Sequence, residues 1–183
     1  MTAVSPRSDG SVGAELELEE LEVALLQSLA RQLIDFVSPD VEETDDPLIA
    51  MVGIDPHATT PDDPALLRLL PDAYSDDQDA AAEFRRFTER DLREAKARNA
   101  ETVLGMLDGA PASVVIGGEE MGAWLGFLND TRLTLGTRLG ITEENHAELD
   151  ALPDDDPRAS LIQVYDWLTF VQDALVQLLL DHD

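Results

Sequence analysis

Cysteine is absent from the 183 residues of this chain. Without cysteine the protein has no disulfide framework, no zinc site built on thiolates and no redox switch that works by thiol chemistry. A domain of this length hides enough surface on folding to form a hydrophobic core without such crosslinks. We therefore expect the fold to be held together by packing.

Positive charge is scarce. The chain has 12 Lys and Arg residues against 39 Asp and Glu residues, which gives a formal net charge of −27. Such a negative field repels nucleic acids, because binding to their phosphates needs Lys and Arg side chains. It repels an anionic membrane surface for the same reason. The composition therefore favours a protein partner, and in particular a basic one.

Long apolar runs are missing as well. No stretch approaches the ~18 residues that a membrane span needs, and residues 1–7 lack the basic and apolar regions of a signal peptide. We therefore expect a cytoplasmic protein. The hydrophobic fraction of 44% is that of a globular protein. The domain organisation predicted is a disordered N-terminal tail at 1–13 followed by a single helical domain at 14–183.

Apolar residues recur at helical spacing in four long segments. They predict long helices over 15–37, from the capping box at 75–78 to 107, over 119–139 and over 158–180. Asp-Pro pairs at 46–47 and 63–64, and Thr142, each predict the start of a short helix. The apolar residues 114–116 predict an extended piece too isolated to imply a sheet. The predicted fold class is all-α: a helical bundle of four long helices plus two or three short helices, with at most a trace of β structure.

Half of the cations lie in one of these helices. Between Glu83 and Arg98 there are six Lys and Arg residues against four acidic ones, so this window has a net charge of +2. Two interpretations stay open: a docking or anion-binding face for a partner, or a helix with internal ion pairs four residues apart. The residues in question are Arg85, Arg86, Arg90 and Arg93.

A second polar group interrupts the apolar pattern of the predicted helix 119–139. Its neighbours are apolar, so these side chains should be partly buried and therefore paired. We expect an ion pair that fixes helix packing rather than a catalytic acid. The members are Asn129, Asp130, Arg132 and Arg138.

Motifs for catalysis, metals or cofactors are not found. The histidines His57, His146 and His182 are scattered, and none lies four residues from another metal ligand on a firmly predicted helix. Glu143 and His146 form one Glu-x-x-His pattern, where a di-iron bundle needs two. No phosphate-binding loop or Ser-His-Asp signature is present. We expect no catalytic residue, no metal site, no cofactor and no enzymatic activity.

Two segments together resemble a known family. They are LLPDAY at 69–74, followed by AEFRRFT at 82–88, and WLGFLNDTRLTLGTRLGI at 124–141. With the Tyr-x-Trp-Leu element at 165–168, they are similar to an actinobacterial family of a domain of unknown function, whose members are described as AosR-like oxidative-stress transcriptional regulators. The resemblance runs from the first helix onward. It implies a cytoplasmic regulator that works through the transcription machinery rather than through a helix set in DNA.

The expected function is therefore non-enzymatic regulation, with transcription modulated through protein–protein interaction. The expected partner is a protein, of the transcription machinery if the resemblance holds, and the apolar first and last helices also fit a homodimer. One alternative is a metal-binding or enzymatic helical bundle that uses carboxylates. Another is direct DNA binding through the Arg-rich helix 83–98. A thiol switch is excluded because there is no cysteine.

Overall fold

The computed structural model describes residues 2–38, 58–74, 76–109, 113–153 and 155–181. In these ranges it has four long helices, two short helices and three strands. The long helices are α1 (Glu20–Val37), α4 (Gln78–Leu107), α5 (Gly118–Leu139) and α7 (Ala159–Leu180). The short helices are α3 (Pro64–Leu69) and α6 (His146–Asp150). The strands are β1 (Ala3–Pro6), β2 (Gly13–Glu17) and β3 (Ser113–Gly117).

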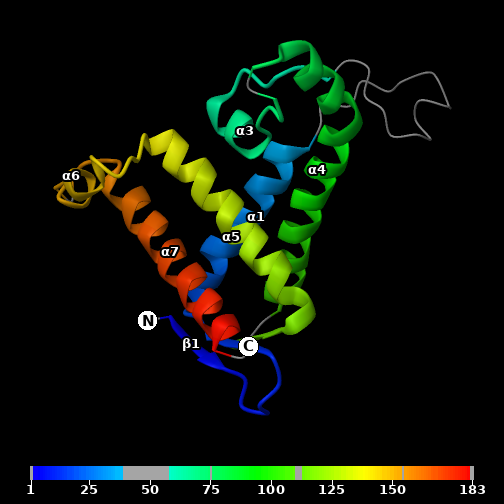
Figure 1. Cartoon of the computed structure of the whole chain (residues 1–183). Helices are drawn as coiled ribbons and strands as arrows, with labels where there is room; N and C mark the ends of the chain where they lie inside the picture. The colour runs from blue at the N-terminus through cyan, green and yellow to red at the C-terminus, as the bar shows by residue number, and fades with distance from the viewer. Residues whose placement is uncertain (1, 39–57, 75, 110–112, 154, 182–183) are drawn as a thin grey trace.

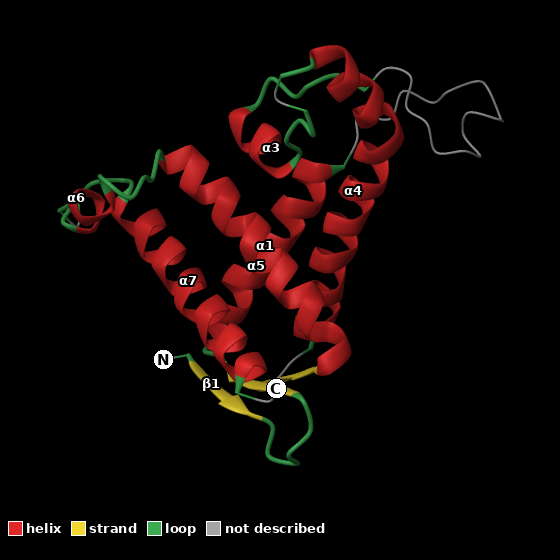
Figure 2. Ribbon diagram, viewed as in Figure 1, coloured by secondary structure: helices red, strands yellow, loops and turns green. Residues whose placement is uncertain are grey.

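The three strands form one antiparallel sheet in the order β1-β2-β3, at the end of the molecule where α7 finishes (Figure 2). Leu16 pairs with Val114 and Ala14 pairs with Ile116, and all four side chains are buried. Alternate residues of β2 and β3 therefore face the core, as expected for a sheet with one covered side.

The prediction of an all-α class is therefore wrong, because the fold mixes helices with a sheet. The sequence pattern predicts residues 15–17 as the start of the first helix and 114–116 as an isolated extended piece, but both belong to the sheet. Strands β2 and β3 pair with each other although they lie about a hundred residues apart in the sequence. Strand β1 lies within the segment 1–13 for which no order was expected.

The helices follow the predicted pattern closely. Helix α1 begins at Glu20, later than predicted because 13–17 belong to β2, and a capping box joins Glu19 with Glu22 at its start. Asp63 caps α3 as predicted, accepting hydrogen bonds from the amides of Ala65 and Leu66. Asp77 caps α4, while Ser75 and the Asp46-Pro47 start lie outside the described residues.

The core is built around α5, which crosses the centre of the molecule (Figure 1) and packs against α1, α3, α4 and α7. Its Trp124, Phe127 and Leu128 are fully buried. Helix α5 ends at Gly140, whose left-handed backbone (φ 66°) is the usual glycine stop. Among the described residues no helix is long and apolar enough to cross a bilayer. Helix α3 packs on α5 as part of this core, whereas α6 lies beside one end of α7 (Figure 1).

Candidate functional site

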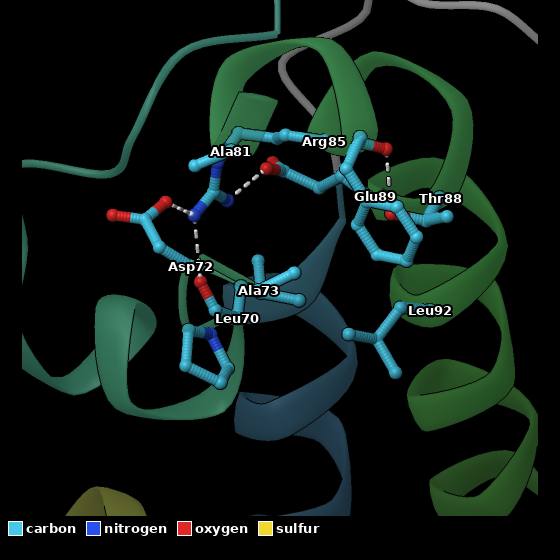
Figure 3. Close-up of a pocket in the computed structure, with 10 residues that line it drawn as sticks. Leu70, Asp72, Ala73, Ala81, Arg85, Thr88, Glu89 and Leu92 are labelled. Atoms are coloured by element: carbon cyan, nitrogen blue, oxygen red, sulfur yellow. Dashed lines mark hydrogen bonds and ion pairs between the residues drawn. The ribbon is translucent and has the colours of Figure 1, made fainter. Parts of the chain in front are cut away.

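Arg85 is the centre of a buried ionic network near the start of α4. Its side chain is only 5% exposed. One guanidinium nitrogen, Nη2, donates to the carbonyl oxygen of Leu70 (3.0 Å) and to Asp72 Oδ1 (2.7 Å). The other, Nη1, pairs with Glu89 one turn further along the helix (Figure 3). Arg85 therefore holds the segment after α3 against α4.

The network continues from Glu89 to Arg93. Arg93 Nη2 lies 2.7 Å from Glu89 Oε1, and Arg93 Nη1 donates to the carbonyl oxygen of Val37 (3.1 Å). Val37 is the last residue of α1. Three segments, the chain after α3, α4 and the end of α1, thus meet through one alternating row of charges.

A pocket of about 190 Å³ opens beside this network. Its charged wall is Arg85 with Asp72 and Glu89, and the rest of its lining is mostly apolar (Figure 3). Arg85 Nε is buried and has no hydrogen-bond partner among the described residues. The other lining residues are Leu70, Pro71, Ala73, Ala81, Phe84, Thr88 and Leu92.

Large apolar side chains stand exposed around the pocket. Tyr74 and Phe84 pack edge to face, with ring centroids 6.0 Å apart, and Phe84 and Leu92 both line the pocket. Phe87 is 53% exposed one helical turn from Phe84. We call these four residues, Tyr74, Phe84, Phe87 and Leu92, the aromatic surface. Because folding normally buries such side chains, an exposed group of them indicates an interaction site.

The rim of the aromatic surface is mostly acidic. Two exposed arginines, Arg86 and Arg90, lie on α4 beside it, and Arg90 is paired with Glu94 at 3.0 Å. The exposed acidic side chains nearby in the chain outnumber them: Asp72, Asp76, Asp77, Asp79, Glu83 and Asp91. The helix that is basic in sequence therefore presents a mixed face, because Arg85 and Arg93 are turned inward.

The polar residues of α5 lie elsewhere and join helices. Asp130 is buried and its Oδ1 lies 2.7 Å from Lys96 Nζ on α4. Burial raises the pKa of Asp130, although the ammonium group of Lys96 acts in the opposite direction. Asn129, its neighbour, is exposed. Asp130 thus sits in an ion pair between α4 and α5.

Two arginines of α5 also reach other elements. Arg132 donates to Thr169 Oγ1 and Gln172 Oε1 on α7, both at 2.8 Å, and lies over the ring of Tyr165. Arg138 pairs with Asp63 at 2.9 Å and lies over the ring of Phe36. The eight polar residues singled out from the sequence are therefore not brought together. Most of them connect neighbouring elements.

Sequence reasoning missed one cluster of titratable side chains. His146 and Asp150 stand four residues apart on α6, and Asp166 faces them from α7. His146 Nε2 lies 3.0 Å from Asp166 Oδ1 and 3.7 Å from Asp150 Oδ1. The available signal was the four-residue spacing of His146 and Asp150, which gains meaning only once that segment is known to be helical.

Comparison with known proteins gives one family. The family described as "Domain of unknown function (DUF2017)" matches residues 1–179. The chain is 33% identical over 174 residues to a Mycobacterium tuberculosis protein named "Oxidative stress regulator AosR", covering 87% of this chain and 78% of that protein. A Mycobacterium leprae protein named "Putative oxidative stress regulator AosR" is 31% identical over 170 residues, 85% of this chain and 77% of that one. No solved structure matches the chain.

Proposed function

The chain belongs to the DUF2017 family, and from that premise we propose that it is a non-enzymatic, cytoplasmic regulatory protein that acts by binding another protein through the aromatic surface. The relatives named as oxidative stress regulators support the regulatory part. The aromatic surface supports the part about protein binding. The proposed outcome is modulation of transcription through the bound partner.

The exposure of Tyr74, Phe84, Phe87 and Leu92 is the observation that carries the proposal. Aromatic and arginine side chains provide most hot spots of protein interfaces, where they fill pockets on the partner or receive anchors from it. Here a pocket lies directly beside exposed rings, so an apolar anchor of a partner can enter it while the rings cover the rest of the contact.

The charges favour a polypeptide with basic residues around that anchor. Acidic side chains predominate at the rim, and the chain as a whole carries a formal charge of −27. Attraction of this kind speeds association and weakens as salt screens it. We therefore expect binding whose rate falls with ionic strength, while the buried apolar contact keeps part of the affinity.

The same charges support a protein partner over DNA. Arg85 and Arg93 both form ion pairs with Glu89, and Lys96 forms an ion pair with Asp130. Cations already paired with carboxylates cannot neutralise phosphates without breaking those pairs. Direct DNA binding through the helix 83–98 is therefore the less favoured alternative.

A role in oxidative stress comes to this chain only through the names of its relatives. The sequence contains no cysteine, so a signal cannot be received by a thiol of this chain. In the proposed function, the step that responds to an oxidant belongs either to the partner or to the control of how much of this protein the cell makes.

Affinity capture with matched variants tests the proposal. The tagged chain, its Phe84→Ser and Phe87→Ser variants and a Phe170→Ser control are exposed to an actinobacterial lysate, and captured proteins are identified by mass spectrometry. Phe170 on α7 is 52% exposed, almost the same as Phe87 at 53%, so the control removes an equal ring from another face. We expect the first two variants to lose a protein that the wild type and the control retain.

Two other results would contradict the proposal. Equal capture by all four proteins would mean that the aromatic surface is not the contact. A shift of duplex DNA at low salt by the wild type, lost in an Arg86→Glu and Arg90→Glu variant, would favour the DNA alternative. Light scattering on the same proteins tells whether a second copy of the chain is the occupant, since Phe87→Ser would then turn a dimer into a monomer.

A further inference from the structure

We propose that His146, Asp150 and Asp166 form a binding site for a divalent transition-metal ion of the Zn²⁺ class, which fastens α6 to α7. The site lies on residues that the proposed protein contact does not use. It combines one imidazole nitrogen with two carboxylate oxygens, a ligand set that suits Zn²⁺ and its first-row neighbours better than Ca²⁺ or Mg²⁺.

The ligand atoms already stand close to the separations that a metal imposes. All three lie within 4.8 Å of one another. In a tetrahedral zinc site with bonds of about 2.0–2.2 Å, ligand atoms are separated by roughly 3.4 Å. The distances from His146 Nε2 to Asp166 Oδ1 (3.0 Å) and to Asp150 Oδ1 (3.7 Å) lie on either side of that value. Shifts of a few tenths of an ångström would bring both of these nitrogen–oxygen distances to that value.

In the part of the chain that the structure describes, neither carboxylate forms an ion pair with a Lys or Arg. Among the described side-chain contacts, both Asp150 and Asp166 lie against His146 Nε2. Their ligand oxygens lie within 4.8 Å of each other, so the two carboxylates repel each other when both are ionised. A divalent cation between them would remove that repulsion.

A protonated His146 imidazole would stabilise the two neighbouring carboxylates less well than a metal ion would. The Nε2 position of His146 carries a single N–H, which donates to one carboxylate oxygen at a time. When Nε2 carries a proton, its nearer acceptor is Asp166 Oδ1 at 3.0 Å, and Asp150 Oδ1 lies further away at 3.7 Å. A metal ion at the shared centre contacts all three ligands together.

The surroundings hold the imidazole in place. The ring of Tyr165 packs edge-on against the His146 ring, with centroids 5.9 Å apart. Arg132 in turn lies over the Tyr165 ring. Helix α6 is only five residues long and packs on α7. A metal bridge between the two helices would therefore order this short element and the turns that flank it.

Metal titration of the metal-free chain tests the site. Zn²⁺ is added in a calorimeter at about 0.3 M NaCl, where a Debye length of roughly 6 Å suppresses diffuse attraction of cations to an acidic protein. Mg²⁺ is titrated in parallel, and Co²⁺ is used as a probe because its visible spectrum reports bound nitrogen and oxygen ligands. We expect one equivalent of Zn²⁺, a Co²⁺ spectrum and little response to Mg²⁺.

Variants locate the binding. His146→Ala and Asp166→Asn should weaken Zn²⁺ binding by at least about tenfold, since even loss of an outer-shell partner has that effect. Glu148 is an exposed acid on the same short helix, and Glu148→Gln should leave the affinity for Zn²⁺ unchanged. Thermal unfolding without metal verifies that each variant folds, and Asp150→Asn and Asp166→Asn, which keep the side-chain shape, retain the test if His146→Ala does not fold.

The proposal is overturned if His146→Ala binds Zn²⁺ as tightly as the wild type, or if Glu148→Gln loses binding equally. Binding that disappears for every protein at high salt would also overturn it, because it would then be counter-ion attraction to the acidic surface. None of these outcomes bears on the aromatic surface, so the proposed function stands or falls separately.

Discussion

Arg93 reaches from the middle of α4 to the carbonyl oxygen of Val37, the last residue of α1, with its Nη1 3.1 Å away. The carbonyls at the end of a helix lack intrahelical partners, and a guanidinium is well suited to satisfy one of them. The same side chain is held on its other edge by Glu89 at 2.7 Å. Glu89 therefore orients two arginines: Arg85, which holds the chain after α3, and Arg93, which holds the end of α1.

Removal of Glu89 should be among the most damaging single changes on α4. Glu89→Ala would leave the buried Arg85 and Arg93 without their shared carboxylate, and breaking a buried pair in this way costs about 3–5 kcal/mol. We expect a fall in the free energy of unfolding of that order, measured by urea denaturation with the slope unchanged.

Glu94 offers a matched control. It also stands between two arginines four residues away, Arg90 and Arg98, but its side chain is 44% exposed against 9% for Glu89. Glu94→Ala should lower the free energy of unfolding far less than Glu89→Ala does, because exposed ion pairs contribute little. Equal losses for the two variants would show that burial does not decide the strength of these pairs.

The contrast between Glu89 and Glu94 also shows how much of the candidate site could be predicted from the sequence. Spacing places both acids four residues from arginines, and the two patterns look alike. Whether an i, i+4 pair is buried depends on which face of α4 meets α1 and the chain after α3. The tertiary packing decides this, not the local sequence. For the same reason Phe84 and Phe87 could not be distinguished from core residues.

The Lys96–Asp130 pair gives a prediction for pH. Since burial raises the pKa of Asp130 above its usual 3.8, the folded state binds a proton more readily than the unfolded state does. The contribution of Asp130 to stability is then fully present below that ordinary value and is lost as pH rises through the folded pKa.

Comparison with Asp130→Asn isolates this effect. The difference in free energy of unfolding, wild type minus variant, should decrease as the pH is raised from about 3.5 to 6, measured by urea denaturation at each pH. A difference that increases over this range would mean that Lys96 outweighs burial and lowers the pKa.

The sheet was harder to predict than the helices because its evidence is divided along the chain. Ala14 and Leu16 alternate with acids, but five positions are too few to separate a strand from the acidic first turn of a helix. Val114 and Ile116 supply the other half of the pattern. Helices carry their evidence within one segment, and their ends were therefore predicted to within a few residues, apart from the start of α1.

Gly13 should be irreplaceable at the start of β2. Its backbone has φ +140°, and a Cβ there would lie 2.2 Å from the carbonyl oxygen of Ile116. Gly13→Ala should therefore force β2 away from β3 and lower stability by about 1–3 kcal/mol or more. Gly10→Ala is the control, because Gly10 has φ +73° but open space around it, so only the backbone penalty applies. Hydrogen exchange of the β2 and β3 amides should increase in the first variant and stay unchanged in the second.

Thr2 ties the beginning of the chain to two helices at once. Its Oγ1 accepts a hydrogen bond from Trp167 Nε1 (2.7 Å) on α7 and donates to Glu22 Oε1 (2.6 Å) on α1. Thr2→Val keeps the shape but removes both bonds, leaving the partly buried indole N–H of Trp167 without its acceptor.

We expect Thr2→Val to lower the free energy of unfolding by about 1–3 kcal/mol and to increase hydrogen exchange in β1 more than in β3. Thr2→Ser, which retains the hydroxyl, should preserve most of the stability. The fluorescence of Trp167 reports the same contact directly, with Trp124, which is fully buried, as a constant background. Protection of β1 that is equal in Thr2→Val and the wild type would show that strand pairing alone holds the N-terminal segment in place.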